Sequence, residues 1–339
     1  MADPPAARRR RRVRSPIPLM VFLAGVVGVA GTTGVLRAAD RRTDDIVRVD
    51  GLELVLTSVP DDGPAENYLL VGSDTREGVD PNSPDFGGIG DASEVSGRRS
   101  DTIMILRREK DGGAALLSLP RDLWVDIAGT GESGRINSAY SEGPQRLAST
   151  ITESLGIPIH HYVEVDFVGF KRIIDQIGGV ELCIEFATRD LHTGLSLQPG
   201  CQKLDGVQSL AFARSRYYEE FREGDWRIDA RADLGRIERQ QLFMRAAVNG
   251  ALETVQSSPF GSGGVLDAVV SSVRIDASVD PIRAGEALRR AAAEKLDTYT
   301  LPVYGDTVGD QSILRLGDGS EPILDYFRGV GPAPPPTGT

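Results

Sequence analysis

Lysine, histidine and cysteine are scarce in this chain of 339 residues, and their scarcity narrows the possible chemistry. Four residues are lysines and the other 34 basic residues are arginines, an imbalance that codon bias explains for scattered positions. The three histidines and two cysteines give poor support for a zinc site, which usually takes about four ligands. We also find no P-loop and no GxSxG nucleophile motif. Arginine clusters and carboxylates remain as the candidates for chemistry.

Beyond the first 16 residues, acidic residues outnumber basic ones. The net charge is −11 at pH 7, and from Arg37 onward 32 basic residues are outnumbered by 48 acidic ones. A broad nucleic-acid-binding surface is not supported, because such surfaces carry an excess of Lys and Arg. The chain is 40% hydrophobic and 26% charged, which predicts a packed globular core.

One uncharged stretch, residues 17–36, is long enough to cross a membrane. As a helix, its 20 residues would rise ~30 Å, the thickness of a bilayer core. Arginines precede it and aspartates follow it, so residues 1–16 are expected in the cytoplasm and the main domain outside. A cleaved signal peptide is the alternative, since Leu36-Arg37-Ala38-Ala39 offers small residues. Both interpretations place the main domain outside the cytoplasm; we expect a single-pass cell-membrane protein.

Composition divides the remaining chain into three parts. Residues 37–64 are predicted to be a linker, residues 65–330 the catalytic domain, and residues 331–339 a disordered proline-rich tail. An oxidising exterior permits a disulfide between Cys183 and Cys201, and the loop between them is short enough to close. Two unpaired thiols are the alternative.

Apolar patterns with strand and helix periods alternate along the domain. This alternation predicts an α/β fold with a mixed central sheet covered by helices on both faces. The predicted strands are residues 67–71, 102–106, 114–119, 123–127, 160–165, 180–186, 298–302 and 312–316. The predicted helices are residues 144–155, 167–177, 205–213, 233–254 and 280–296.

Charged residues gather at the ends of several predicted strands. Asp74 follows the first strand, Asp101 precedes the second, and Arg121-Asp122 follows the third. Catalytic residues often lie on loops at strand ends. Two aspartates on separate strand ends match a Mg²⁺ site that is completed by phosphate oxygens.

A second group consists of arginines in the C-terminal half. Arg214 and Arg216 lie two residues apart and point to one face if the chain is extended there. Arg236 and Gln240 lie four apart on one face of a predicted helix, with Arg239 alongside. Guanidinium groups bind phosphate oxygens through paired hydrogen bonds, so converging arginines match a diphosphate. For each cluster taken alone, a solvated helix face or a surface ion pair is the alternative interpretation.

In their order along the chain, these pieces resemble the LytR–CpsA–Psr family of cell-wall glycopolymer ligases. The resemblance covers most of residues 66–252. It is carried by the segments Asn67–Arg76, Arg99–Thr102, Ser118–Asp122, Arg135–Tyr140, His161–Phe167, Gly178–Val180, Leu204–Gly206, Ala213–Arg216 and Asp233–Gln241.

The resemblance implies transfer of a glycopolymer from a polyprenyl-diphosphate carrier to a wall acceptor, usually peptidoglycan, through a phosphodiester link. Membrane, carrier lipid and peptidoglycan are the implied partners, without nucleic acid. A diphosphate hydrolase that uses water as acceptor is one alternative. A non-catalytic regulator that binds lipid diphosphate is another.

The resemblance also implies a role for each matching residue. Arg121 takes the catalytic position, Asp122 orients it or accepts a proton, and Asp101 acts with the metal. Asp74 and Asp101 would hold Mg²⁺ or Mn²⁺. The implied diphosphate-binding residues are Arg99, Arg121, Arg214, Arg216, Arg236, Arg239 and Gln240.

Two features concern the acceptor and the lipid. The segment 217–232 is longer and more acidic than the family pattern, and residues 77–98 look inserted, so acceptor and polymer identity stay open. The isoprenoid chain would need an apolar tunnel. Its candidate walls, for which ordinary core packing is the alternative, are Phe167, Phe170, Ile173, Ile174 and Phe212.

Overall fold

A computed structural model describes most of the predicted domain. The described residues are 45–59, 65–73, 100–109, 113–215, 217–228, 239, 243, 246, 247, 250, 262–280 and 297–336. The predicted transmembrane segment 17–36 lies outside them, as do nearly all of the predicted helix 280–296 and most of the predicted helix 233–254. Within the described residues, no helix has both the length and the apolar character that a membrane crossing requires.

A seven-stranded mixed sheet forms the centre of the fold, as predicted. Its strand order is β1-β14-β7-β2-β3-β4-β15. Strand β2 runs parallel to β7 and antiparallel to β3, and β4 runs antiparallel to β3 and parallel to β15. The bounds are β1 (Val47–Arg48), β2 (Ala65–Ser73), β3 (Ser100–Glu109), β4 (Ala114–Leu119), β7 (His161–Val165), β14 (Val273–Ile275) and β15 (Asp297–Thr300).

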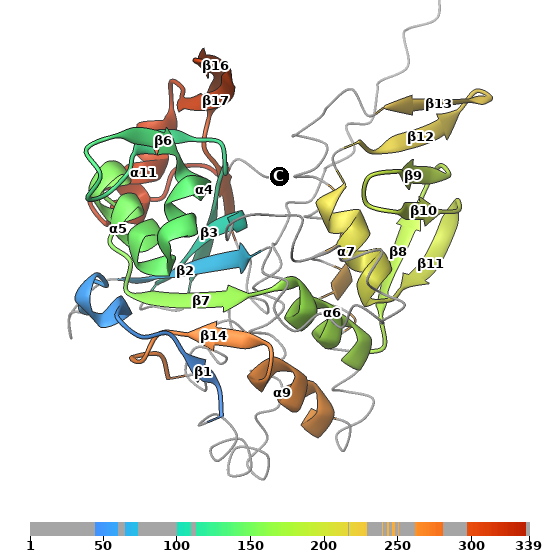
Figure 1. Cartoon of the computed structure of the whole chain (residues 1–339), viewed down its shortest axis with the longest axis horizontal. Helices are drawn as coiled ribbons and strands as arrows, with labels where there is room; N and C mark the ends of the chain where they lie inside the picture. Colours follow the sequence, from blue (N-terminus) through green and yellow to red (C-terminus); the bar gives the residue numbers. More distant parts are fainter. Residues whose placement is uncertain are drawn as a thin grey trace, which may run out of the picture.

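Helices cover both faces of this sheet. Successive side chains of a strand point to opposite faces, so each face of the sheet contributes to its own apolar cluster. On β2, Leu69 and Val71 belong to one cluster, and Tyr68 and Leu70 belong to the other. The first cluster includes residues of α4 (Ile136–Ala139), α5 (Pro144–Leu155) and α11 (Ser320–Arg328). The second includes residues of α6 (Phe167–Gln176), α7 (Gly206–Arg214) and α9 (Ser262–Val270). Figure 1 shows the two helical groups on opposite sides of the strands.

Local sequence signals explain where the main helices begin and end. Helix α5 begins with Pro144 and ends at Gly156, whose φ of 70° suits a residue without a Cβ. Helix α6 begins after Asp166, whose carboxylate accepts a hydrogen bond from the Gly169 amide. Helix α7 follows Asp205, which forms a capping box with Gln208.

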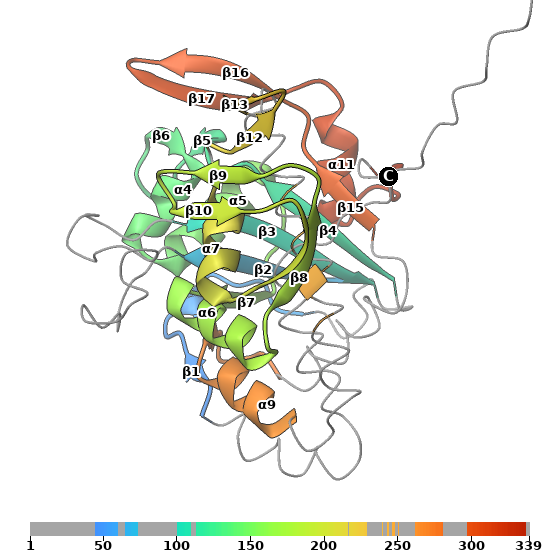
Figure 2. The same cartoon turned by 90° about the vertical axis from the view of Figure 1, so that its right-hand side faces the viewer.

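Smaller sheets and hairpins surround the main sheet. A four-stranded sheet has the order β10-β9-β12-β13, and three two-stranded pairs are β8–β11, β5–β6 and β16–β17. Figure 2 places β5, β6, β12, β13, β16 and β17 at the same end of the molecule, and Figure 1 agrees for those that it labels, β6, β12, β13, β16 and β17. The bounds are β5 (Trp124–Asp126), β6 (Ser133–Arg135), β8 (Val180–Ile184), β9 (Thr188–Asp190), β10 (Leu195–Leu197), β11 (Gly200–Leu204), β12 (Glu219–Arg222), β13 (Asp225–Ile228), β16 (Val303–Val308) and β17 (Gln311–Leu316).

The predicted disulfide is confirmed. Cys183 on β8 and Cys201 on β11 are directly opposite each other in the antiparallel pair, and their sulfur atoms are bonded. Directly opposed residues of such a pair have neighbouring Cβ atoms, which brings the two thiols together.

Residues on both sides of the predicted domain contact it. Strand β1, within the predicted linker, pairs with β14, and Leu52 after it is fully buried, so residues 45–59 take part in the core. Apolar residues between the polar ones provide this packing. At the other end, residues 331–336 have no helix or strand, and the Tyr299 hydroxyl donates a 3.0 Å hydrogen bond to the carbonyl of Pro334. The C-terminal third belongs to the same core, because it supplies β14 and β15.

Candidate functional site

The carboxyl ends of four strands meet at one edge of the main sheet. Strands β7, β2, β4 and β15 run in the same direction, and β3, antiparallel between β2 and β4, begins at this edge. In α/β sheets, ligands bind outside the carboxyl ends of the strands. The positions that follow these ends include Asp74 after β2, Arg121 after β4 and Asp166 after β7. We call this region the carboxyl edge.

A β-bulge lies at the carboxyl edge between β2 and β3. Gly72 is paired with Thr102 and Ser73 with Ser100, so Asp101 is the extra residue of the bulge. Bulges often lie next to active sites, where they redirect a side chain. Asp101 therefore lies at the carboxyl edge, and Asp74 lies outside the described residues.

Two buried hydroxyls lie at the same place. Ser73 and Ser100 are fully buried. The Ser100 hydroxyl has no hydrogen-bond partner among the described residues, and the Ser73 hydroxyl has only that of Tyr140 within range. Opposed residues of an antiparallel pair share a face of the sheet, so these two oxygens lie on one side. A buried hydroxyl without a partner costs about 1–3 kcal/mol, which a ligand would recover by supplying a partner.

The oxygen-rich chemistry of this edge fits Mg²⁺, which prefers hydroxyl, carboxylate, phosphate and water oxygens. Among the described residues, no three His, Cys, Asp or Glu side chains lie close enough to hold a metal by themselves. The predicted ligand Asp74 lies outside the described residues, so the metal site stays a prediction.

Arg121 and Asp122 lie together after β4, beside a third charged residue. The Arg121 Nε is 3.5 Å from one Asp122 carboxylate oxygen, and the Arg135 Nε is 3.7 Å from the other. The Asp122 carbonyl accepts a 2.9 Å hydrogen bond from the amide of Leu314, and Arg135 donates 2.7 Å to the carbonyl of Ser312. Asp122 is thus held between two guanidinium groups beside strand β17.

Arg214 also lies at the carboxyl edge. It is the last residue of α7, and its guanidinium carbon is 4.4 Å from the centre of the Phe167 ring. Phe167 begins α6 two residues after the end of β7, so this cation–π contact brings Arg214 to the strand ends.

Arg239 anchors the chain that leaves α7. It is buried, stacks 4.2 Å from the centre of the Tyr218 ring and donates a 3.1 Å hydrogen bond to the Ser215 carbonyl. These contacts hold the segment that connects Arg214 to β12. The other predicted site residues, Arg99, Arg216, Arg236 and Gln240, lie outside the described residues.

A buried carboxylate beside the site was not singled out from the sequence. Glu164 on β7 accepts hydrogen bonds from the Tyr140 hydroxyl at 2.6 Å and the Tyr162 hydroxyl at 2.8 Å. Burial and the Glu164 charge raise the pKa of both tyrosines above the usual value. Ser73 lies beside Tyr140, so the group reaches the carboxyl edge. The sequence signal for Glu164 was a glutamate inside a mostly apolar predicted strand. Arg135 stood out only as part of the segment Arg135–Tyr140.

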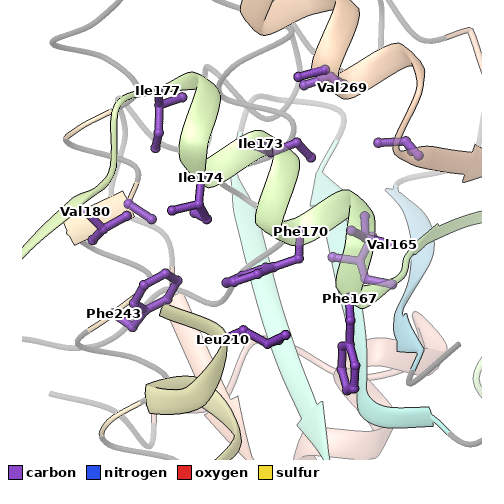
Figure 3. Close-up of a cluster of buried hydrophobic side chains, with 14 of the residues drawn as sticks. Val165, Phe167, Phe170, Ile173, Ile174, Ile177, Val180, Leu210, Phe243 and Val269 are labelled. Carbon is purple, nitrogen blue, oxygen red and sulfur yellow. The ribbon is translucent and has the colours of Figure 1, made fainter. Parts of the chain in front are cut away.

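The five predicted tunnel-wall residues all belong to the apolar cluster between the sheet and α6, α7 and α9. Figure 3 shows Phe167 and Phe170 on α6, with Phe170 directed toward Phe243 and Leu210. The two phenylalanine rings Phe170 and Phe243 are 5.7 Å apart. Within the described residues these side chains pack as a core, and the tunnel stays a prediction.

Comparisons with known proteins agree with the fold. The model of the LytR_cpsA_psr family matches residues 37–319. Over 248 residues the chain is 32% identical to the probable cell wall biosynthesis protein LcpB of Corynebacterium glutamicum, covering 72% of this chain and 55% of that one. Thus the chain spans only about half the length of that relative.

A second relative and a solved structure extend the comparison. The chain is 32% identical over 238 residues to the polyisoprenyl-teichoic acid–peptidoglycan teichoic acid transferase TagU of Halalkalibacterium halodurans, covering 68% of this chain and 72% of that one. The LytR-Csp2A-Psr enzyme from Actinomyces oris superimposes with a TM-score of 0.62 at 28% identity, covering 83% of this chain and 95% of that one. The chain belongs to the LytR_cpsA_psr family.

Proposed function

We propose that this protein transfers a glycopolymer from a polyprenyl-diphosphate carrier to a cell-wall acceptor, most simply peptidoglycan. An acceptor hydroxyl oxygen forms a bond to the sugar-linked phosphorus, and the bond from that phosphorus to the bridging oxygen of the diphosphate breaks. Polyprenyl phosphate leaves and the acceptor hydroxyl loses its proton. The product is a phosphodiester between polymer and wall.

The carboxyl edge is the observation that carries this proposal. At this edge lie the Arg121–Asp122 ion pair, the start of α6 on which Arg214 packs, the bulge at Asp101 and the buried hydroxyls of Ser73 and Ser100. Phosphoryl transfer depends mainly on positioning and on charge stabilisation, which arginines supply through paired hydrogen bonds. The named transferase among the relatives supports the same reaction class.

Within this edge the described residues divide into two roles. Arg121 and Arg214 bind the diphosphate oxygens from opposite sides, since one follows β4 and the other packs on the start of α6. Asp122, between Arg121 and Arg135, fixes the direction of both guanidinium groups. Asp122, 3.5 Å from the Arg121 Nε, is also the predicted proton acceptor for the acceptor hydroxyl.

A divalent cation, Mg²⁺ or Mn²⁺, completes the proposed site. Asp74 and Asp101 would hold it, and the Ser73 and Ser100 hydroxyls could bind its water ligands or a phosphate oxygen. When bound, the cation would neutralise charge on the diphosphate during transfer.

We also propose a place in the cell. Residues 17–36 would anchor the chain in the cell membrane, with the basic tail in the cytoplasm and the domain outside. This arrangement gives the domain access to a lipid-linked donor in the membrane and to the wall beyond it.

A transfer assay tests the reaction. The full-length protein in detergent would be incubated with a synthetic polyprenyl-diphosphate glycan, Mg²⁺ and a peptidoglycan fragment, and the products analysed by mass spectrometry. We expect the acceptor to gain the glycan through a phosphodiester. Release of lipid phosphate with no modified acceptor, for a range of wall acceptors, would instead indicate a hydrolase.

A further inference from the structure

The acidic segment after α7 forms an ordered hairpin with an aromatic face. Strands β12 and β13 pair from Glu219↔Ile228 to Arg222↔Asp225, and β12 also pairs with β9. Because side chains alternate along strands, one face of this sheet carries Arg189, Glu219, Phe221, Trp226 and Ile228. We call these five residues the hairpin face.

The hairpin face is open to solvent. Phe221 is 43% exposed and Ile228 is 61% exposed, whereas Thr188 and Asp190, on the other face of β9, are buried. Figure 1 shows β12 and β13 projecting at the outer side of this sheet. Trp226, on the same face, is half-buried. A contiguous exposed apolar patch is a common feature of binding sites.

Contacts within the hairpin face produce a surface that is partly aromatic and partly charged. The Phe221 and Trp226 rings are 5.3 Å apart, and the Arg189 guanidinium carbon lies 4.2 Å from the centre of the Trp226 ring. Arg189 also pairs with the Glu219 carboxylate at 2.5 Å. Aromatic rings therefore lie next to one guanidinium and one carboxylate, which can exchange hydrogen bonds with hydroxyl groups.

This combination matches the chemistry of a sugar ring. A pyranose has an apolar C–H face, which packs on an aromatic ring, and a rim of hydroxyls, which pairs with planar charged groups. A purely apolar partner would leave the Arg189–Glu219 pair without water or hydrogen-bonding partners, which costs free energy.

The charge of the hairpin further limits the ligand. Residues 219–228 contain four acidic and two basic side chains. The hairpin face itself holds one charged side chain of each sign, Arg189 and Glu219, and the hairpin has no excess of positive charge that would attract anionic lipid headgroups or phosphate-rich polymers. It therefore favours a glycan without phosphate, which among the two proposed substrates is the acceptor strand and not the donor polymer.

The hairpin is also fixed to the carboxyl edge. Arg214 lies five residues before β12, and the intervening segment is held by buried Asp190, which accepts hydrogen bonds from the Ser215 hydroxyl at 2.7 Å and the Tyr217 amide at 3.0 Å. Both views place β12 and β13 at the same end of the molecule as β17, beside which Asp122 lies.

We propose that the hairpin face binds the glycan strand of the acceptor by stacking sugar rings on Phe221 and Trp226. This inference rests on the proposed transferase function for the identity of the acceptor, but glycan binding itself can be measured separately. The site sets affinity for the acceptor and does not touch the reacting phosphate.

A fluorescence titration tests the binding. The chain has two tryptophans, Trp124 and Trp226, so in the full-length W124F protein the emission reports on the hairpin face. The probe is chitotetraose, a neutral oligomer of N-acetylglucosamine. We expect a saturable emission change, and Phe221→Ser or Ile228→Ser should raise the half-saturating concentration about tenfold. The matched control is Leu54→Ser, because Leu54 is 84% exposed and lies on the 3-10 helix Leu52–Leu54, away from the hairpin.

The transfer assay adds a second arm. Phe221→Ser should raise the KM for the acceptor about tenfold while the KM for the lipid donor and kcat stay unchanged. An unchanged half-saturation and an unchanged acceptor KM in both hairpin variants would overturn the inference, even if wild-type transfer is normal. Absence of transfer in the wild type would count against the proposed function, and the titration would still decide the inference.

A lipid control separates the glycan from a membrane surface. Vesicles of phosphatidylcholine with phosphatidylglycerol should leave the Trp226 emission unchanged. An emission change with vesicles but none with chitotetraose would overturn the inference and identify the hairpin face as a membrane contact.

Discussion

The hydroxyl of Tyr140 donates a 2.6 Å hydrogen bond to the buried carboxylate of Glu164. Tyr140 follows α4, whereas Glu164 lies on β7, so this bond joins the helical layer to the sheet next to the carboxyl edge. Tyr162 donates a second hydrogen bond to the other carboxylate oxygen. With a donor at each oxygen, the carboxylate needs no cation as a partner. The Tyr140–Glu164 hydrogen bond therefore fixes the position of Tyr140 beside Ser73.

Removal of one hydroxyl from this group should lower stability. In Tyr140→Phe, the Glu164 oxygen loses its donor in a buried place, which costs about 1–3 kcal/mol in the free energy of unfolding. Urea denaturation followed by circular dichroism measures the change. Tyr304→Phe is the matched control, since Tyr304 is 53% exposed and should behave as wild type.

The same hydroxyls predict a loss of stability in alkali. Burial raises the pKa of Tyr140 and Tyr162 in the folded state above the unfolded value of about 10. Their stabilising contribution is therefore complete below pH about 10 and decreases as pH rises above it, because the unfolded chain then loses protons that the folded chain keeps. The slope per tyrosine is at most about 1.4 kcal/mol per pH unit. Urea midpoints between pH 8 and 11 should fall less steeply in Tyr140→Phe; equal slopes would refute this origin.

Arg135 is expected to matter for catalysis although the sequence alone did not single it out. Arg135→Ala removes one of the two guanidinium groups at Asp122 and the hydrogen bond to Ser312, so Arg121 should lose its fixed direction. We expect kcat to fall on the order of tenfold or more, with partial recovery in Arg135→Lys. Steady-state transfer kinetics measure this effect. Arg315→Ala, which breaks an exposed pair with Asp306, serves as the control and should keep wild-type kcat.

The disulfide should contribute to stability more than to turnover. Cys183 and Cys201 are 18 residues apart, and closing a loop of this size stabilises by about 3 kcal/mol in the chain-entropy view. The double Cys183→Ser, Cys201→Ser variant should lose that amount in urea denaturation. Reductant should lower the stability of the wild type by the same amount and leave the stability of the double variant unchanged. That result would assign the effect to the disulfide.

Much of this fold follows from local patterns. Strand β4 and helix α5 have the predicted bounds, because Pro120 stops the strand and Gly156 ends the helix. Strand β1 was missed because only two residues pair, and their partner β14 lies more than 200 residues away in the chain. Pairing over that distance leaves no local signal.

The site divides in the same way. Arg121 and Asp122 stand out in sequence as a charged pair after a strand. The roles of Glu164 and Arg135 depend on contacts with Tyr140 and Ser312, which only the tertiary structure brings near. The sequence shows that the segment 217–232 is acidic. Which aromatic side chains share its exposed face follows only from the β12–β13 register.

The most direct test of the central claim is transfer by Arg121→Ala and Asp101→Ala in the full-length protein. The assay would follow the phosphodiester product by mass spectrometry with polyprenyl-diphosphate glycan, Mg²⁺ and a peptidoglycan fragment, and urea denaturation would verify folding. We predict that both variants fold and lose transfer by about three orders of magnitude or more, since each removes charge stabilisation at the transferring phosphate. Wild-type transfer in both folded variants would contradict the placement of the active site at the carboxyl edge.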